Sequence, residues 1–386
     1  MSRHHTRAAA HGWKARLDGI IRANVCLKQS GDGRRTGLGT RRNVTQGLMR
    51  LFGVLRHDLG YGIENPAQLQ AKHVKAWAEW LQERWAFGDL QPATVAGYAS
   101  YIRILCRWIG KPDLEKELAL MDPNCKRRRQ CADTDKSWEG RGLDIGALIE
   151  RAMAEEPWVG YALLAQAAFG LRRKEAVCLV PAQDYVPQAG VLLVTRGTKG
   201  GRPRQVQLYT AWQFEVMAVL IHFCQRGAHR KSHLGGDGRS LASNLRRYSY
   251  ILSSKLGVSR DLAGTTGHGL RAGFACRLLS AYGVTAPVRG GNPAVLAPEV
   301  VGRAYKATTE ALGHSRTDVC GAYVGSKRAG GGQAHPDGPD ASRIDPPDMA
   351  GLVASMAARW EAELGGVRTS RRLAKAAGLT PTVTNF

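Results

Sequence analysis

The stretch "WVGYALLAQAAFGLRRKEAVCLV" at residues 158–180 decides how the larger part of this chain folds. It predicts two consecutive helices, with the break at Gly170, because glycine is the residue that most readily ends a helix. Arg172 and Glu175 stand three residues apart in the second helix, so their side chains can face each other. Taken alone, such a pair is most often an ordinary surface salt bridge.

The sequence around these two predicted helices indicates a mostly helical α+β domain at residues 143–328. Two short strands, "GVLLVT" and "RQVQLY", flank the turn-rich "RGTKGGRP" and predict a β-hairpin. Upstream, "DIGALIERAMAEE" predicts a helix with Asp144 as its N-cap. Further helices are predicted at 211–224, 240–256, 266–281, 299–312 and 316–324.

Residues 46–122 are predicted to form a separate, small helical bundle. Apolar residues recur there at spacings of three and four, which indicates amphipathic helices. The three helical stretches are 44–60, 71–85 and 94–110. Thr94, just after Pro92, is the predicted cap of the third helix. The tryptophans of the second stretch are interpreted as core residues rather than platforms for stacking bases.

Two segments of the chain are strongly basic and lack helical periodicity. Residues 1–45 hold ten Lys or Arg against two Asp, and residues 123–142 contain four consecutive basic residues. A disordered, solvated arm is one interpretation of the first segment, and an arm that grips phosphates is the other. The second is interpreted as a linker that crosses a nucleic-acid backbone. The candidate DNA contacts are Arg34, Arg35, Arg41, Arg42, Lys126, Arg127, Arg128 and Arg129.

Residues 329–386 are predicted to be a linker followed by a C-terminal helix and tail. The segment "AGGGQAHPDGPDASRIDPPD" is rich in Gly, Pro and Asp, as flexible linkers are. The following "MAGLVASMAARWEAEL" places apolar residues on one helical face. A lone amphipathic helix must dock, either on its own domain or on a neighbouring copy of the chain.

The overall charge favours a nucleic-acid partner. The 386 residues carry a formal net charge of +23, and the pI is about 10.1. This balance points to a polyanion, and no stretch approaches the roughly 20 apolar residues that a membrane-spanning helix needs. The basic amino terminus lacks the apolar core of a secretion signal. Eight cysteines without a Cys-x-x-Cys pair indicate reduced thiols rather than a disulfide framework or a zinc site.

Three further short segments of the larger domain carry reactive side chains. Lys199 stands at the tip of the predicted hairpin, where a soluble turn is the simplest explanation. "HGLRAG" places His268 and Arg271 three residues apart near a helix start, without the further ligand that a metal site would need. "EALGHSRTDVCGAYVG" places Tyr323 nine positions after His314, with no obvious core to fill.

In their order and spacing these pieces resemble the tyrosine recombinase, or phage integrase, family. The resemblance covers residues 143–326 closely, and the upstream bundle is similar to the core-binding domain of the family only in kind. It rests on Gly-Leu-Arg with Glu175, a hairpin lysine, His-x-Leu-Arg, Leu-Gly-His and a tyrosine nine residues on. The residues that match the catalytic set are Arg172, Lys199, His268, Arg271, His314 and Tyr323.

The resemblance implies a site-specific DNA recombinase of a mobile genetic element, which works without a metal or another cofactor. Tyr323 would attack a phosphodiester and form a 3′-phosphotyrosine, while Arg172 and Arg271 would bind the non-bridging oxygens. Lys199 would protonate the leaving 5′-oxygen. His268 would assist proton transfer, and His314 would hydrogen-bond the phosphate. Glu175 is expected to orient Arg172.

The implied partners are double-stranded DNA, three further copies of the chain in a tetramer on paired sites, and accessory DNA-bending proteins. The implied location is the cytoplasm, at the nucleoid. Two departures from the family pattern stand out: Ala272 after the second arginine, and an insertion at 282–300. The alternatives are a type IB topoisomerase, which relaxes DNA as a monomer, and a DNA-binding protein that has lost catalysis on the same fold.

Overall fold

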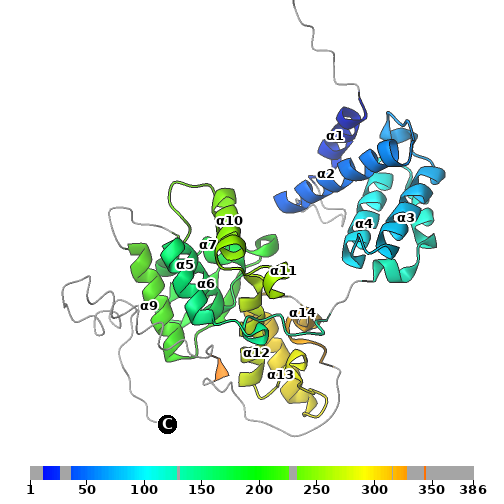
Figure 1. Ribbon diagram of the computed structural model, residues 1–386. Helices are drawn as coiled ribbons and strands as arrows, with labels where there is room; N and C mark the ends of the chain where they lie inside the picture. The colour runs from blue at the N-terminus through cyan, green and yellow to red at the C-terminus, as the bar shows by residue number, and fades with distance from the viewer. Residues whose placement is uncertain are drawn as a thin grey trace, which may run out of the picture. The chain divides into compact units, whose positions relative to one another are not determined.

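The computed structural model describes residues 12–26, 36–127, 131–225, 233–314, 316–327 and 343–344. The chain divides into two compact units, Met1–Arg129 and Gln130–Phe386 (Figure 1). The predicted C-terminal helix lies outside the described residues, as do four of the predicted DNA contacts: Arg34, Arg35, Arg128 and Arg129.

The first unit is a helical bundle around an aromatic core. Its main helices are α1 (Trp13–Asn24), α2 (Leu38–Gly53), α3 (Ala71–Ala86) and α4 (Pro92–Trp108), followed by the 3-10 segment η3 (Pro112–Leu120). Trp77 is fully buried and donates its indole N–H to the Leu51 carbonyl at 2.7 Å. Its ring packs edge-on against Phe52. Trp77 and Trp80 of the predicted stripe are therefore core residues, as expected.

The start of the bundle differs from the predicted basic arm at residues 1–45. Helix α1 lies within that segment, and its Trp13, Leu17 and Ile21 are buried in the core of the bundle. The spacing of four between these residues gives a narrow apolar stripe, which the high charge of the segment obscured. Thr94 is also not a helix cap, because α4 already begins at Pro92, where proline is favoured in the first turn.

The second unit is mostly helical and contains one small sheet. Its first elements are α5 (Ile145–Glu155), α6 (Pro157–Phe169), α7 (Arg173–Val177), α8 (Pro181–Asp184), β1 (Tyr185–Val186), β2 (Val191–Val194) and β3 (Arg204–Gln207). The later helices are α9 (Ala211–Gln225), α10 (Leu241–Tyr250), α11 (Arg260–Ala263), α12 (His268–Ala281), α13 (Pro298–Ala311) and α14 (Gly321–Val324). In the described part of the chain no helix combines the length and apolar character that crossing a bilayer requires.

Helix α6 is the centre of this unit, with every residue from Trp158 to Phe169 buried. It packs against α5, α9 and α12. Gly170 ends it in the left-handed conformation, with φ of 59°. A Cβ atom there would lie 2.3 Å from the ring of Phe274, so the corner needs glycine for both its conformation and its space. Asp144 caps α5 as predicted and accepts a hydrogen bond from the Ala147 amide at 2.9 Å.

The sheet is antiparallel, with strand order β1-β2-β3. The predicted hairpin is formed by β2 and β3, and Val194 pairs with Arg204. The two-residue strand β1 was not predicted, because it is too short to show an alternating pattern. Along β3, Arg204 and Val206 face inward and their neighbours face outward.

The described residues 131–142 belong to the second unit, which differs from the predicted linker at 123–142. Trp138 is fully buried in the core of that unit. Its indole N–H donates to the Thr266 carbonyl at 2.9 Å. Polar residues around the tryptophan gave this stretch the composition of a loop, although one large apolar side chain fixes it to the domain.

Replacing Trp138 tests this assignment. We expect Trp138→Ala to lower the free energy of unfolding of the second unit by about 3–5 kcal/mol, because a large buried ring is lost. Trp138→Phe keeps an aromatic ring and removes one hydrogen bond to the Thr266 carbonyl, which still accepts from the Gly269 amide at 2.8 Å, so a smaller loss of about 1 kcal/mol is expected. Denaturant unfolding followed by circular dichroism measures both. A change below about 1 kcal/mol for Trp138→Ala would show that the segment is a linker.

Candidate active site

The corner between α6 and α7 presents the first arginine of the site. Arg172 is the N-cap residue of α7, and Glu175 is the third residue of that helix. The Glu175 carboxylate accepts from the Arg172 backbone amide at 2.8 Å and from its guanidinium at 2.6 Å. The two side chains thus face each other as predicted. Glu175 is buried, so the pair is not a surface salt bridge.

Glu175 holds two further arginines. Arg204 on β3 donates to its carboxylate at 2.9 Å, and a guanidinium nitrogen of Arg271 lies 3.8 Å away. Burial alone would raise the pKa of Glu175. The charge of Arg204, the Arg172 amide and the charge of Arg271 outweigh burial and lower this pKa to about 2. Glu175 is therefore ionised at neutral pH and neutralises part of the charge of three guanidinium groups.

Arg271 is completely buried on α12. Its guanidinium donates to the carbonyls of Gly170 and Leu312, and its Nε donates to the Tyr323 hydroxyl at 3.2 Å. Burial and the neighbouring charges of Arg204 and Arg172 lower the pKa of Arg271 to about 10, which leaves it protonated at neutral pH. This hydrogen bond holds the Tyr323 oxygen beside the guanidinium charge of Arg271.

Tyr323 lies on the short helix α14 and is half-buried between two histidines. The His314 ring stacks on the tyrosine with centroids 5.6 Å apart, and the His268 ring lies at 5.3 Å. The Nδ1 atom of His314 is buried and has no hydrogen-bond partner among the described residues. Both imidazole rings therefore pack against the ring of Tyr323.

The two histidines are neutral at pH 7. Desolvation, followed by the charges of Arg271 and Arg172, lowers the pKa of His314 to about 4. His268 is an exposed residue, yet the protein atoms around its ring and the same two arginines lower its pKa to about 4. A neutral imidazole can accept a proton, as the predicted role of His268 requires.

Lys199 is the most loosely held member of the set. It is exposed at the turn between β2 and β3, in the segment η7 (Lys199–Gly201). Its charge also contributes to the lowered pKa of His314. Contacts join the other five predicted residues into one cluster, and Lys199 lies on the hairpin whose strand β3 carries Arg204 of that cluster.

Arg204 is the residue of this cluster that sequence reasoning missed. It is 6% exposed, and its guanidinium donates to Glu175 and to the carbonyls of Ala311 and Gly170. A usable signal was present, because "RQVQ" alternates and places an arginine on the same inward face as Val206. A charged residue on an inward face requires a partner, and Glu175 was the acidic residue already assigned to the site.

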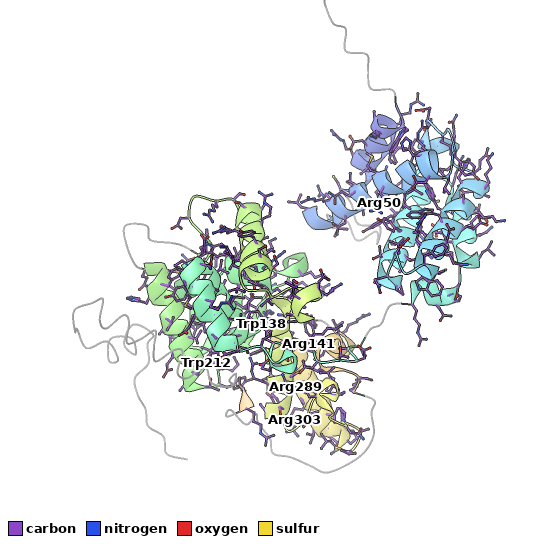
Figure 2. The ribbon with its side chains drawn as sticks, viewed as in Figure 1. Arg50, Trp138, Arg141, Trp212, Arg289 and Arg303 are labelled. Atoms are coloured by element: carbon purple, nitrogen blue, oxygen red, sulfur yellow. The ribbon has the colours of Figure 1, made fainter. Side chains whose placement is uncertain are left out.

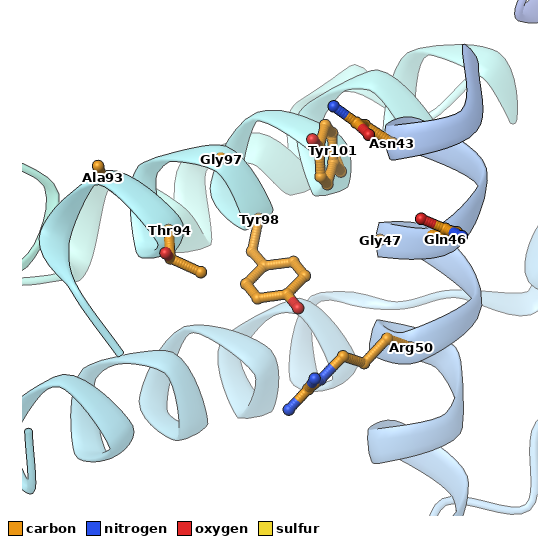
Figure 3. Close-up of a pocket in the computed structure, with 9 residues that line it drawn as sticks. All are labelled: Asn43, Gln46, Gly47, Arg50, Ala93, Thr94, Gly97, Tyr98 and Tyr101. Carbon is orange, nitrogen blue, oxygen red and sulfur yellow. The ribbon is translucent and has the colours of Figure 1, made fainter. Parts of the chain in front are cut away.

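The first unit carries a polar groove between α2 and α4, shown in Figure 3. Its volume is about 460 Å³. The lining residues recur at helical spacing: Asn43, Gln46, Gly47 and Arg50 on α2, and Ala93, Thr94, Gly97, Tyr98 and Tyr101 on α4. A Cβ atom on Gly47 would lie 2.4 Å from the Tyr101 ring, so glycine permits this ring to pack against α2. Asn, Gln and Arg are side chains that read base edges in DNA.

Four of the predicted DNA contacts in this unit have described side chains: Arg41, Arg42, Lys126 and the exposed Arg127. Arg41 and Arg42 lie near the start of α2, where Arg41 donates to the Thr36 carbonyl at 2.8 Å. Lys126 donates to the Leu118 carbonyl at 2.8 Å. The ammonium of Lys126 is therefore part of the bundle surface and not of a free basic run.

The cysteines and acidic residues do not assemble into a metal site. All eight cysteines are free, and five of them are buried. Within the ranges that the structure describes, no group of three or more His, Cys, Asp or Glu side chains is arranged to hold a metal ion.

Comparison with known proteins finds one matching family model. Residues 127–277 match the family model described as Integrase. The matched segment contains Arg172, Lys199, His268 and Arg271, and it ends before His314 and Tyr323. No protein of curated function matches the chain.

Several solved structures resemble the chain at low identity. The Tn1549 transposon integrase in complex with a circular intermediate DNA has 15% identity and a TM-score of 0.48, with 80% of this chain and 93% of that chain covered. For a lambda integrase dimer bound to a COC′ core site, the identity is 15%, the TM-score 0.46 and the coverage 82% and 77%. For XerH recombinase bound to its palindromic difH substrate, the values are 14%, 0.45, 80% and 79%.

The Glu175 cluster predicts a specific pattern of stability. We expect Glu175→Gln to lower the free energy of unfolding at pH 7 by about 3–5 kcal/mol, because buried guanidinium groups lose their counter-charge. The lowered pKa of Glu175 means that its stabilisation is complete above pH 4.5 and is lost as the pH falls toward 2. The deficit of the variant should therefore shrink over that range in denaturant unfolding experiments.

Glu155→Gln is the matched control for this experiment. Glu155 pairs with Lys255 at 3.4 Å on the surface, so its replacement should cost less than about 1 kcal/mol. Equal effects of the two substitutions would contradict the role assigned to Glu175.

Proposed function

We propose that the chain, whose residues 127–277 match the family model described as Integrase, is an enzyme that cleaves and rejoins DNA, with Tyr323 as its nucleophile. The observation that carries this proposal is the hydrogen bond from Arg271 to the Tyr323 hydroxyl inside a cluster of arginines and neutral histidines. Such a cluster suits a phosphodiester, since phosphoryl transfer depends mainly on positioning and charge stabilisation.

In the proposed reaction the Tyr323 oxygen attacks phosphorus, and the bond from phosphorus to the 5′-oxygen breaks. His268 accepts the phenolic proton, and Lys199 donates a proton to the leaving 5′-oxygen. Arg172 and Arg271 bind the non-bridging oxygens through their planar forks. Water is not consumed, and attack by a 5′-hydroxyl on the phosphotyrosine reverses the sequence and rejoins DNA without ATP.

The chain is further proposed to act as a site-specific recombinase of a mobile genetic element. The net charge of +23 and the integrase match support a DNA substrate in the cytoplasm, at the nucleoid. Recombination between two sites would use a tetramer, with accessory DNA-bending proteins as further partners. The proposed specificity surface is the groove of the first unit, together with the basic residues at 34–42 and 126–129.

A covalent-adduct experiment tests the reaction class. We expect the unaltered protein, mixed with nicked DNA from the ends of its element without metal or ATP, to form a protease-sensitive adduct on a denaturing gel. Tyr323→Phe should form none, because the attacking oxygen is absent, although it should bind the same DNA. Binding without an adduct in either protein would favour the non-catalytic alternative.

The groove between α2 and α4 makes a separate prediction. Arg50 is exposed at this groove, so Arg50→Ala should weaken binding to the cognate site by about 1–3 kcal/mol if it contacts a guanine. Arg84→Ala is the control, because Arg84 lies on α3 in a surface pair with Asp89. Mobility-shift titrations on cognate and scrambled DNA separate the cases. Equal weakening on both DNAs would mean a phosphate contact and no base reading.

A further inference from the structure

The helix that carries Tyr323 cannot fix its own position. Helix α14 is four residues long and follows the 3-10 turn η10 (Thr317–Cys320). A helix this short gains too few hydrogen bonds to be stable by itself. The place of the tyrosine hydroxyl therefore depends on the surroundings of α14: helix α12, from which Arg271 reaches the hydroxyl, and the segments that hold the two ends of α14.

The start of α14 is held by residues 131–132. The Ala132 amide donates to the Gly321 carbonyl at 2.8 Å. A Cβ atom on Gly321 would lie 2.9 Å from the Cys131 sulfur, so the glycine allows close packing. This contact begins immediately after the basic run at 126–129, in the first described residues of the second unit.

The end of α14 is held by the loop between α12 and α13. Gly325 follows the helix with φ of 94°, and a Cβ atom on it would lie 2.7 Å from Pro287. Pro287 begins the 3-10 segment η9 (Pro287–Arg289), which lies within the insertion predicted at 282–300. The insertion is packed rather than splayed into solvent, because Val284 and Ala286 are buried in the core of the unit.

Arg289 joins these two supports. Its guanidinium donates to the Asp135 carboxylate at 2.8 Å and to the Ser137 hydroxyl at 3.1 Å. Glu139 lies 3.8 Å from the same guanidinium. Figure 2 labels Arg289 and Trp138, the buried residue that lies between Ser137 and Glu139 in the sequence. The insertion that holds the end of α14 is thus tied to the segment that holds its start.

The ion pair between Arg289 and Asp135 is strong, although it lies near the surface. Burial alone would raise the pKa of Asp135, but hydrogen bonds from Ser137 and the charge of Arg289 lower it. The carboxylate is therefore ionised at neutral pH. It binds a guanidinium whose side chain is 30% exposed, where partial desolvation strengthens a charge-assisted hydrogen bond.

We propose that Arg289 is a positioning residue for Tyr323. Arg289 binds the insertion to residues 135–139 and thereby links the two segments that hold the ends of α14. This role rests on the proposed function, since it concerns the nucleophile of that reaction. Among the described residues, the hydrogen bonds and ion pairs of Arg289 go to Asp135, Ser137 and Glu139, and none goes to Tyr323 or the other five catalytic residues. It acts through Pro287 on Gly325 and through the segment that contacts Gly321.

Arg289→Ala should slow cleavage without weakening DNA binding. We expect the first-order rate of adduct formation at saturating nicked DNA to fall about tenfold to a hundredfold, since a small misplacement of a reacting group has effects of this size. The affinity in mobility-shift titrations should stay within about twofold, because the arginine is engaged with Asp135. Arg289→Lys keeps the charge opposite Asp135 and should recover part of the rate. Arg260→Ala, at an exposed arginine on α11, is the matched control and should react at the unaltered rate.

A sulfur substitution separates nucleophile positioning from help to the leaving group. A 5′-bridging phosphorothiolate releases a thiolate, which needs no proton, so this DNA should rescue Lys199→Ala. It should not rescue Arg289→Ala, in which the attacking group is misplaced. Rescue of Arg289→Ala by sulfur, or an adduct rate within about twofold of the unaltered protein, would overturn the proposal.

Two further controls keep the result decisive. If Arg289→Ala does not fold, as judged by thermal unfolding, Asp135→Asn removes the charge with little change in shape and should show the same rate defect. A normal rate of adduct formation in a folded Asp135→Asn variant would then reject the positioning role of Arg289. No adduct from the unaltered protein would instead reject the proposed function, and the role of Arg289 with it.

Discussion

The buried carboxylate of Glu175 is the contact on which the rest of the site depends. It lies within 2.6, 2.9 and 3.8 Å of Arg172, Arg204 and Arg271, respectively. Guanidinium groups gathered out of water repel one another, and each loses hydration. One ionised carboxylate at their centre offsets part of this repulsion and leaves the cluster with a net positive charge. A phosphodiester is the kind of group that such a residual charge attracts.

Two helix ends complete this neutralisation. Gly170 closes α6, and Leu312 follows the last residue of α13. Their carbonyls accept from Arg271, while the Ala311 carbonyl accepts from Arg204. The C-terminus of a helix carries unpaired carbonyls and a partial negative charge, so both ends favour a nearby cation. The same contacts bring the α6 corner and the end of α13 together, which places His314 beside Tyr323.

The sequence allowed most of the site to be predicted, because its parts lie in local patterns. The spacing of Arg172 and Glu175, the break at Gly170 and the hairpin around Lys199 are each visible within a few residues. What could not be predicted depends on contacts between distant segments. The partnership of Arg204 with Glu175 spans 29 positions, and the contact of Arg289 with Asp135 spans 154. Composition gave the wrong prediction where a few apolar residues stand among many polar ones, as Trp138 does in the segment that was predicted to be a linker.

The lowered pKa values of His268 and His314 connect this electrostatic arrangement to the order of the reaction. Without substrate, the positive cluster keeps both rings neutral at pH 7. A bound phosphodiester adds a negative charge beside them, and an opposite charge at close range raises a histidine pKa by about one to three units. Each ring then holds a proton more readily once DNA is in place. Acceptance of a proton by His268, which the proposed reaction requires, is thereby favoured when a phosphate is present to be attacked.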